Sequence, residues 1–308
     1  MAPARAQERS CLSPAHGACE PRKQAVEGSR MALDVRAFTA FERAAHDRIA
    51  TAYAKHFAPL TALALKPLLD VAQITEGRQV LDVATGPGVA AAAAQARGAA
   101  VTGVDVAPGM VALAQRAYPK VEFKVAEVVA LPFPDSAFDA VLCNFGLGHF
   151  PAPEVALAEC VRVLAPGGVL AFSWWDQPVR QRVQGLFREA IAELGLPPPP
   201  EVPQGHDTMR FSDPEAFAGL LRGAALEGVQ VVAHRTTYSM PNVEALWQAG
   251  MGGMAVTAAA IAAQDAATQS QAREVIARRA EAHRGPQGLE IPIAYFIGAG
   301  QKPSTSTS

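Results

Sequence analysis

Short apolar runs alternate with longer amphipathic segments through the middle of the chain. The runs have the length and continuous hydrophobicity of buried strands, and the segments between them have the spacing and composition of helices. Alternation of this kind predicts an α/β fold with a mostly parallel sheet. The predicted strands cover residues 79–83, 100–105, 121–125, 138–143 and 169–174.

The pattern changes after the fifth predicted strand. Two further strands are expected at 229–238 and 291–298, and the residues between them, at 243–254 and 256–283, are rich in alanine and helical in character. We expect this interval to form a helical cap over the edge of the sheet. It either faces a ligand or only covers the sheet, and its candidate apolar contacts are Trp247, Met251 and Met254.

The N-terminal part contains two kinds of sequence. Residues 1–30 show no sustained apolar period and no apolar core of a secretory signal, so we predict disorder there. This segment is either a transit peptide or a stretch ahead of a start at Met31. Residues 38–57 and 60–71 then carry apolar residues at helical spacing, which indicates two helices.

Composition and charge narrow the class of partner. With 308 residues, half of them hydrophobic, the chain can bury a substantial core in one large or two small domains. The net charge is −2 and no long basic run is present, which argues against a nucleic-acid partner and favours a small molecule. No window reaches the about 18 apolar residues that span a bilayer. A homo-oligomer is compatible with the sequence but is not specified by it.

The four cysteines bear on the compartment. Cys143 and Cys160 lie in predicted core elements and are expected to act as small buried apolar residues. Cys11 and Cys19 flank His16, but three ligands on an unstructured stretch do not make a metal site. No disulfide framework and no metal site are predicted, which favours a reducing compartment, the cytoplasm. Import into an organelle is the alternative.

The first predicted strand ends in a glycine turn that leads into a helix. Gly86 and Gly88 lack the Cβ atoms that would keep a ligand away from the backbone, and the helix at 89–96 offers unpaired N–H groups. Asp105 ends the second strand at the spacing where an acid accepts hydrogen bonds from ribose hydroxyls. The alternative for Asp105 is an N-cap of the helix at 108–117.

Four motifs follow one another in an order that is typical of one enzyme family. They are LDxxxGxG within 80–88, VD followed by PGM at 104–110, LPFPDxxFD at 131–139 and RVLxPGG at 162–168. Through these motifs the chain resembles the class I S-adenosylmethionine-dependent methyltransferases. The resemblance is strongest to the small-molecule branch that includes the ubiquinone and menaquinone methyltransferases.

The resemblance implies a fold and a division of the chain. The fold is a doubly wound, Rossmann-like sheet of seven strands whose last strand is antiparallel, with a helical cap. After the N-terminal extension, cap helices occupy 31–76 and the S-adenosylmethionine-binding core 77–176. The remainder of the sheet with its cap insertions follows at 177–300, and a polar tail covers 301–308.

The resemblance also implies how the methyl donor is held. Asp82 would set the glycine loop and face the methionine part of the ligand, and Asp105 would bind the ribose. Glu127 would accept a hydrogen bond from the adenine amino group, at a position where the family more often has aspartate. The other implied donor contacts are Ala84, Thr85, Gly86, Pro87, Gly88, Val106, Met110, Ala126, Val128, Asn144 and Phe145.

The loop after the fourth strand carries the candidate catalytic residue, His149. A histidine that titrates near neutral pH can take a proton from a hydroxyl or an acidic carbon. The alternative is a loop histidine that packs on the cofactor or faces water. Nearby aromatic residues also have two interpretations, contact with a ligand or packing of core and lid; they are Tyr53, Phe57, Trp174 and Trp175.

The predicted activity is methyl transfer from S-adenosylmethionine to oxygen or carbon of a small hydrophobic metabolite. The sulfonium donor needs little activation, so alignment of the reactants can supply much of the catalysis. Two alternatives stay open. One is a protein that binds the nucleotide without catalysis. The other is a nicotinamide-dependent oxidoreductase, whose fingerprint would need a third glycine where this chain has Ala91.

Overall fold

The computed structural model describes residues 34–199, 202–203 and 207–304. The predictions for residues 1–30, with Cys11, His16 and Cys19, and for the end of the polar tail lie outside these ranges. Cys143 and Cys160 are described, and both are buried free thiols as predicted.

The sheet is built from strands β1 (Gln79–Val83), β2 (Ala100–Asp105), β3 (Glu122–Val125), β4 (Phe138–Asn144), β5 (Leu164–Trp175), β6 (Glu227–Met240), β7 (Arg284–Gly285) and β8 (Gly288–Gln301). Seven of them follow the order β3-β2-β1-β4-β5-β8-β6, and β7 pairs with β8. Strands β1 to β5 pair in parallel, whereas β8 is antiparallel to both β5 and β6. The predicted α/β class with an antiparallel last strand is therefore confirmed.

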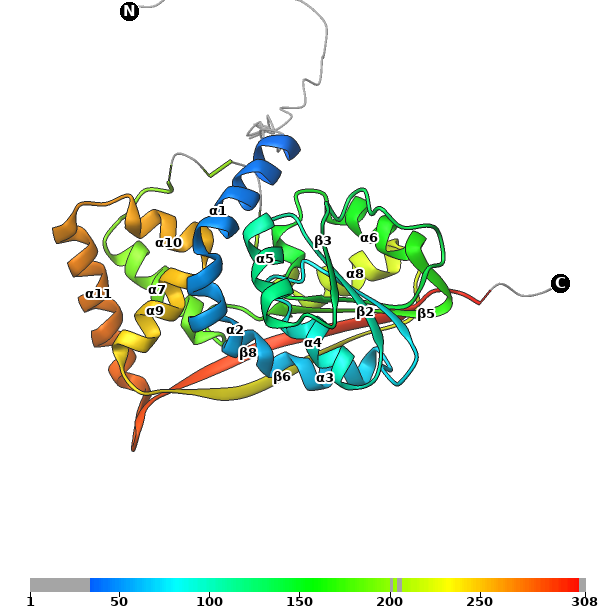
Figure 1. The fold of residues 1–308 in the computed structure, drawn as a ribbon. Helices are drawn as coiled ribbons and strands as arrows, with labels where there is room; N and C mark the ends of the chain where they lie inside the picture. The colour runs from blue at the N-terminus through cyan, green and yellow to red at the C-terminus, as the bar shows by residue number, and fades with distance from the viewer. Residues whose placement is uncertain (1–33, 200–201, 204–206, 305–308) are drawn as a thin grey trace, which may run out of the picture. The chain divides into compact units, whose positions relative to one another are not determined.

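The helices are α1 (Val35–His56), α2 (Ala58–Thr61), α3 (Leu65–Val71), α4 (Val89–Ala96), α5 (Pro108–Ala117), α6 (Pro153–Val163), α7 (Arg182–Glu193), α8 (Pro214–Gly223), α9 (Val243–Gly253), α10 (Ala255–Ala262) and α11 (Ala266–Ala280). In Figure 1, α7, α9, α10 and α11 gather on the left as the predicted cap, and α3 to α6 and α8 lie on the right with the sheet. Helix α1 lies between the two groups and packs against α5, α9 and α10. It therefore joins the cap to the parallel half of the sheet.

Helix α1 starts at a side-chain cap and carries an unusual buried stripe. The backbone N–H groups of Arg36 and Ala37 both donate to Oδ1 of Asp34 at 3.0 Å, which satisfies N–H groups that have no partner within the helix. The buried side chains that follow include Phe38 and Glu42. A carboxylate in a buried helix face is costly unless it is paired, so Glu42 indicates a polar site beneath α1.

Two predicted helices are shorter in the structure because the chain breaks them. The helix expected at 60–71 divides at a 3₁₀ turn, Ala62–Ala64, before α3. Pro67 has no N–H to donate to the carbonyl of Leu63, and the hydroxyl of Tyr295 donates to that oxygen instead at 3.0 Å. The helix expected at 256–283 divides into α10 and α11, because Asp265 caps a new start by accepting from the N–H of Thr268.

Most residues of α10 are buried, whereas α9 and α11 each bury one face. Within the described residues, no single helix combines the length and apolar composition needed to cross a bilayer. Helices α9 and α10 reach that length and apolar composition only when they are taken together, and the chain bends by 106° between them.

The packing of α9 on α7 can be tested with a pair of glycine substitutions. A Cβ on Gly250 would lie 2.0 Å from Cζ of the buried Phe187, whereas a Cβ on Gly219 in α8 would meet open space. We expect Gly250→Ala to lower the free energy of unfolding by about 1–3 kcal/mol through overpacking. Gly219→Ala, the matched control, should raise it by about 0.5–1 kcal/mol through helix propensity. Chemical denaturation measures both, and a Gly250→Ala protein as stable as the control would contradict this packing.

Candidate active site

The candidate site lies at the carboxyl ends of β1, β2 and β4, where the strand order reverses between β1 and β4. Ala84 (φ 52°) after β1 and Phe145 (φ 60°) after β4 have a left-handed backbone, a strain that often marks functional sites. The two turns touch, because a Cβ on Gly146 would lie only 2.6 Å from Cβ of Ala84. Both turns line one cavity, so their strained backbones shape its surface.

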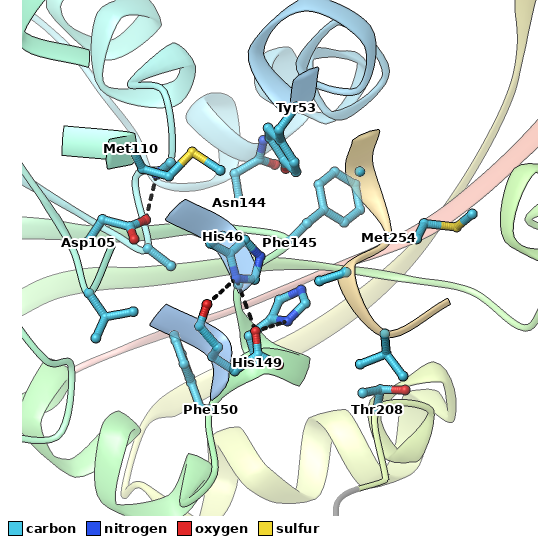
Figure 2. A pocket seen from close by; sticks show the side chains of 18 of the residues that line it. His46, Tyr53, Asp105, Met110, Asn144, Phe145, His149, Phe150, Thr208 and Met254 are labelled. Atoms are coloured by element: carbon cyan, nitrogen blue, oxygen red, sulfur yellow. Dashed lines mark hydrogen bonds and ion pairs between the residues drawn. The ribbon is translucent and has the colours of Figure 1, made fainter. Parts of the chain in front are cut away.

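Two cavities contain nearly all of the sequence-predicted site residues. The larger has a volume of about 190 Å³. The smaller, of about 30 Å³, shares part of its lining with the first and adds Asp82, Thr85 and Pro87. The predicted residues that line the larger cavity are Ala84, Gly86, Asp105, Val106, Met110, Ala126, Glu127, Val128, Asn144, Phe145 and His149, and Figure 2 shows several of them around it.

Asp105 is fixed by backbone donors at the end of β2. The N–H of Gly86 donates to its Oδ2 at 2.8 Å, and the N–H of Ala107 donates to its Oδ1 at 2.9 Å. The N-cap of α5 is Ala107, so the N-cap interpretation of Asp105 is wrong. Burial raises the pKa of the Asp105 carboxyl, and the N–H of Ala107 and the nearby His46 oppose the shift. Asp105 thus links the glycine turn to β2 and presents a carboxylate to the larger cavity.

Asp82 is a fully buried carboxyl beside the smaller cavity. The hydroxyl of Thr85 donates to its Oδ2 at 2.6 Å, whereas among the described residues Oδ1 has no hydrogen-bond partner. Burial raises the pKa of Asp82 to about 7, although the Thr85 hydroxyl opposes the shift. An unpaired buried oxygen of this kind suits a cationic or N–H-bearing ligand group.

Gly88 lines neither cavity. Its backbone is left-handed (φ 87°) at the start of α4, and a Cβ there would lie 2.8 Å from Cζ of Phe123 and 3.0 Å from Cβ of Ala114. The described structure therefore gives Gly88 a role in packing α4 against β3 and α5. Its predicted contact with a donor stays a prediction.

Two further predicted residues are held by neighbours from the N-terminal helices. Glu127 accepts from Nη2 of Arg43 at 3.2 Å, in an exposed ion pair at the cavity edge. The side-chain amide of Asn144 donates to the carbonyl of Thr61 at 3.2 Å, and its Oδ1 accepts from the hydroxyl of Ser173 at 2.7 Å. These contacts fix the orientation of Asn144 at the cavity wall and leave Glu127 more open.

His149 was predicted from the sequence as a candidate catalytic residue, but its two partners on α1 were not. Nδ1 of His149 lies 3.1 Å from Oε2 of Glu42, and Nδ1 of His46 lies 3.1 Å from the same oxygen (Figure 2). The two imidazole rings meet edge to face, with centroids 4.9 Å apart. We call these residues the Glu42 cluster. Glu42 and His46 are four residues apart, which places them on one helix face, but only the fold brings His149 to them.

The charges within the Glu42 cluster are matched. Burial by itself would raise the pKa of Glu42, but His149 and His46 hold it well below its usual range. Burial would lower the pKa of His46, but the hydrogen bond and charge of Glu42, with Asp105 adding to them, raise it to about 9. Glu42 is therefore a carboxylate that accepts, so the proton of a neutral His149 sits on Nδ1. Its Nε2 then keeps the lone pair that can take up a proton.

The Glu42 cluster has the side chains of a metal site, but its geometry favours hydrogen bonds. The ligand atoms of Glu42, His46 and His149 lie within 4.8 Å of one another. However, Nδ1 of His46 is also 2.9 Å from the backbone oxygen of Glu42, a distance that requires an N–H on this nitrogen. While Nδ1 of His46 carries this proton it cannot ligate an ion, so we interpret the arrangement seen as a carboxylate that holds two imidazoles.

Aromatic residues form one wall of the larger cavity. Phe145 stacks on Trp175 with centroids 3.7 Å apart, and Phe57 meets the same indole edge to face at 6.0 Å. Tyr53 and Trp174 also line the cavity. The aromatic residues with two predicted interpretations therefore pack against the core and also face the cavity. Of the cap candidates, Met254 lines the cavity, and among its lining residues neither Trp247 nor Met251 occurs. Trp247 stacks on Phe187 instead.

Comparison with known protein families identifies a methyltransferase domain at residues 81–172. The chain is 31% identical over 169 residues to a demethylmenaquinone methyltransferase from Beutenbergia cavernae, which covers 52% of this chain and 70% of that protein. It is 46% identical over 126 residues to the corresponding protein from Thermus thermophilus, covering 39% of this chain and 57% of that one. The chain spans about half of the length of several such relatives, for example 52% of that from Renibacterium salmoninarum.

Solved structures share the fold at low sequence identity. A putative methyltransferase from an antibiotic biosynthesis pathway of Anabaena variabilis matches with a TM-score of 0.54 at 16% identity, covering 76% of this chain and 95% of that one. The YcgJ protein of Bacillus subtilis matches with a TM-score of 0.51 at 17% identity, covering 78% and 98%. With motifs, fold and relatives in agreement, the chain belongs to the class I S-adenosylmethionine-dependent methyltransferases, the family that includes the demethylmenaquinone methyltransferases.

Proposed function

We propose that this protein transfers a methyl group from S-adenosylmethionine to oxygen or carbon of a small, largely apolar metabolite. The observation that carries the proposal is the junction of two kinds of surface in one cavity. Asp105 and the strained turns after β1 and β4 form one part, and His149 with an aromatic wall forms the other. A donor and an acceptor can therefore meet inside the same enclosure.

The residues present suit the donor. The unpaired Oδ1 of buried Asp82 suits the ammonium group of the donor's methionine part, and the carboxylate of Asp105 suits ribose hydroxyls. Glu127 stands at the cavity edge, where it would receive the adenine amino group, and Met110, Ala126 and Val128 supply apolar contacts. The backbone N–H groups that fix Asp105, and the Thr61 carbonyl and Ser173 hydroxyl that fix Asn144, would keep this surface in shape before the ligand arrives.

The bound donor supplies an electrophilic methyl group on a sulfonium. The work of the protein is then to hold the acceptor in line and to keep water away, which can supply up to about 7–11 kcal/mol of the barrier. Where the acceptor arrives protonated, Nε2 of His149 takes its proton. Glu42 keeps the proton of Nδ1 in place and stabilises the imidazolium that forms.

We expect the purified full chain to bind S-adenosylhomocysteine and to transfer the methyl group of methyl-labelled S-adenosylmethionine to members of a panel of phenols, naphthols and hydroxyquinones. Calorimetry measures the binding, and scintillation counting of organic extracts measures transfer. Tight binding without transfer to any acceptor would favour a protein that binds the nucleotide without catalysis. Displacement of the ligand by NAD would favour the oxidoreductase.

A further inference from the structure

The outer end of the larger cavity carries a positive charge. Arg188 of α7 lines the cavity there, together with Gln184 one turn earlier and Thr208 from the segment before α8. Nη2 of Arg188 lies 3.4 Å from Oγ1 of Thr208, a long contact with an uncharged group. Arg188 is an exposed residue that also lines the cavity, so a ligand in the cavity can reach it.

Other arginines near this face are paired with carboxylates. Nη1 of Arg182, on the same helix, lies 2.7 Å from Oε1 of Glu189, and Nη2 of Arg210 lies 2.8 Å from Oε1 of Glu154. Among the described residues, Arg188 has no carboxylate within ion-pair distance. The cavity walls desolvate it in part, which lowers its pKa, and Asp207 opposes the shift only at longer range. Arg188 therefore lines the cavity with Thr208 as its hydrogen-bond partner, and within the described part of the chain its other donors stay available to a ligand.

Trp174 lies next to both His149 and Thr208, the residue that Arg188 contacts. Its indole ring meets the imidazole of His149 edge to face, with centroids 5.9 Å apart. Its Nε1 donates to the backbone oxygen of Thr208 at 3.2 Å, so the same indole also adjoins the residue that Arg188 contacts. A ligand along this wall would meet His149 at one end, an apolar surface in the middle and a guanidinium at the other end.

We propose that Arg188, with Gln184 and Thr208, binds a carboxylate of the methyl acceptor. The proposal rests on the proposed function, since it assumes that the acceptor occupies this cavity. A guanidinium binds a planar carboxylate through two parallel N–H donors, and the neighbouring amide and hydroxyl can bind its remaining lone pairs. The acceptor class is thus an aromatic or otherwise apolar hydroxy acid whose hydroxyl and carboxylate lie at opposite ends.

The test uses a rigid probe with this arrangement, 6-hydroxy-2-naphthoate, and its methyl ester as the neutral counterpart. Each is titrated calorimetrically into the full chain saturated with S-adenosylhomocysteine, and the acid also into the ligand-free chain. We expect Arg188→Met to weaken binding of the acid by about 10- to 100-fold and to change binding of the ester by less than about twofold. Arg188→Lys should fall between, because it keeps the charge but loses the paired donors.

Arg116→Met is the matched control, because Arg116 is an exposed arginine on α5 outside the cavity. It should bind both probes as the parent protein does. Failure of the acid to bind the parent, or an equal loss of acid and ester in Arg188→Met, would overturn the carboxylate subsite. If S-adenosylhomocysteine does not bind but the acid binds in a manner that depends on Arg188, the subsite stands and the proposed function fails.

Discussion

Replacement of His149 by alanine is expected to lower kcat for a hydroxyl acceptor by about 10²- to 10⁴-fold, the usual contribution of a positioned general base. The affinity for S-adenosylhomocysteine should change by less than about twofold, because the proposed donor contacts are made by other residues, chiefly Asp82, Asp105 and Glu127. His56→Ala, a change at the end of α1 away from the cavity, is the control and should leave kcat unchanged.

Glu42→Gln separates positioning from simple packing in the same experiment. Glutamine fills nearly the same volume but provides no negative charge for the imidazolium, so we expect a loss of about 10- to 100-fold in kcat. The pKa of His46, which burial lowers but Glu42 raises to about 9, should also fall, because its imidazolium loses its counter-charge. A role of Glu42 in packing alone would reduce stability without changing kcat. An unchanged kcat in both His149→Ala and Glu42→Gln would mean that the acceptor arrives already deprotonated and that no base is used.

The parallel half of the fold and its ligand edge were predictable because their determinants are local. A buried strand, a glycine turn and an acid after the next strand each occupy a short stretch, so the positions of Asp82, Gly86 and Asp105 follow from sequence spacing. The strand at β8 and the cap helices were predicted from the local pattern, and the antiparallel direction of β8 was predicted through family resemblance. Breaks in the predicted helices needed particular contacts, such as the hydroxyl of Tyr295 that takes the place of the missing N–H of Pro67.

The substrate side was less predictable because its residues come from distant parts of the chain. Glu42 is 107 positions from His149, and in the sequence it looks like an ordinary charge on an amphipathic helix. Its burial at 3% exposure is what reveals it as part of a site. Arg188 could not be singled out from the sequence either. Arg182 and Arg210 pair with carboxylates, and only this comparison makes it informative that Arg188 has no such partner within the described ranges.

Asp105→Ala is expected to reduce the affinity for S-adenosylmethionine and S-adenosylhomocysteine by about 10²- to 10⁴-fold. Asp105 would accept two hydrogen bonds from ribose hydroxyls, and each contributes about 1.5–3 kcal/mol when the acceptor is charged. The substitution also removes the acceptor of the Gly86 and Ala107 N–H groups, which should loosen the glycine turn and add to the loss. Asp105→Asn keeps one oxygen acceptor and should lose less.

The control variant should be less stable than the parent but should leave the residues that line the cavity unchanged. Asp265→Ala is such a variant. Asp265 caps α11 in the helical cap, and its removal should cost about 0.5–2 kcal/mol of stability. Its affinity for the donor should nevertheless match that of the parent. Calorimetric titration of the three variants beside the parent therefore distinguishes a lost ribose contact from a general loss of stability. Donor affinity that survives Asp105→Ala would contradict the ribose assignment, and with it the placement of the donor at the ends of β1 and β2.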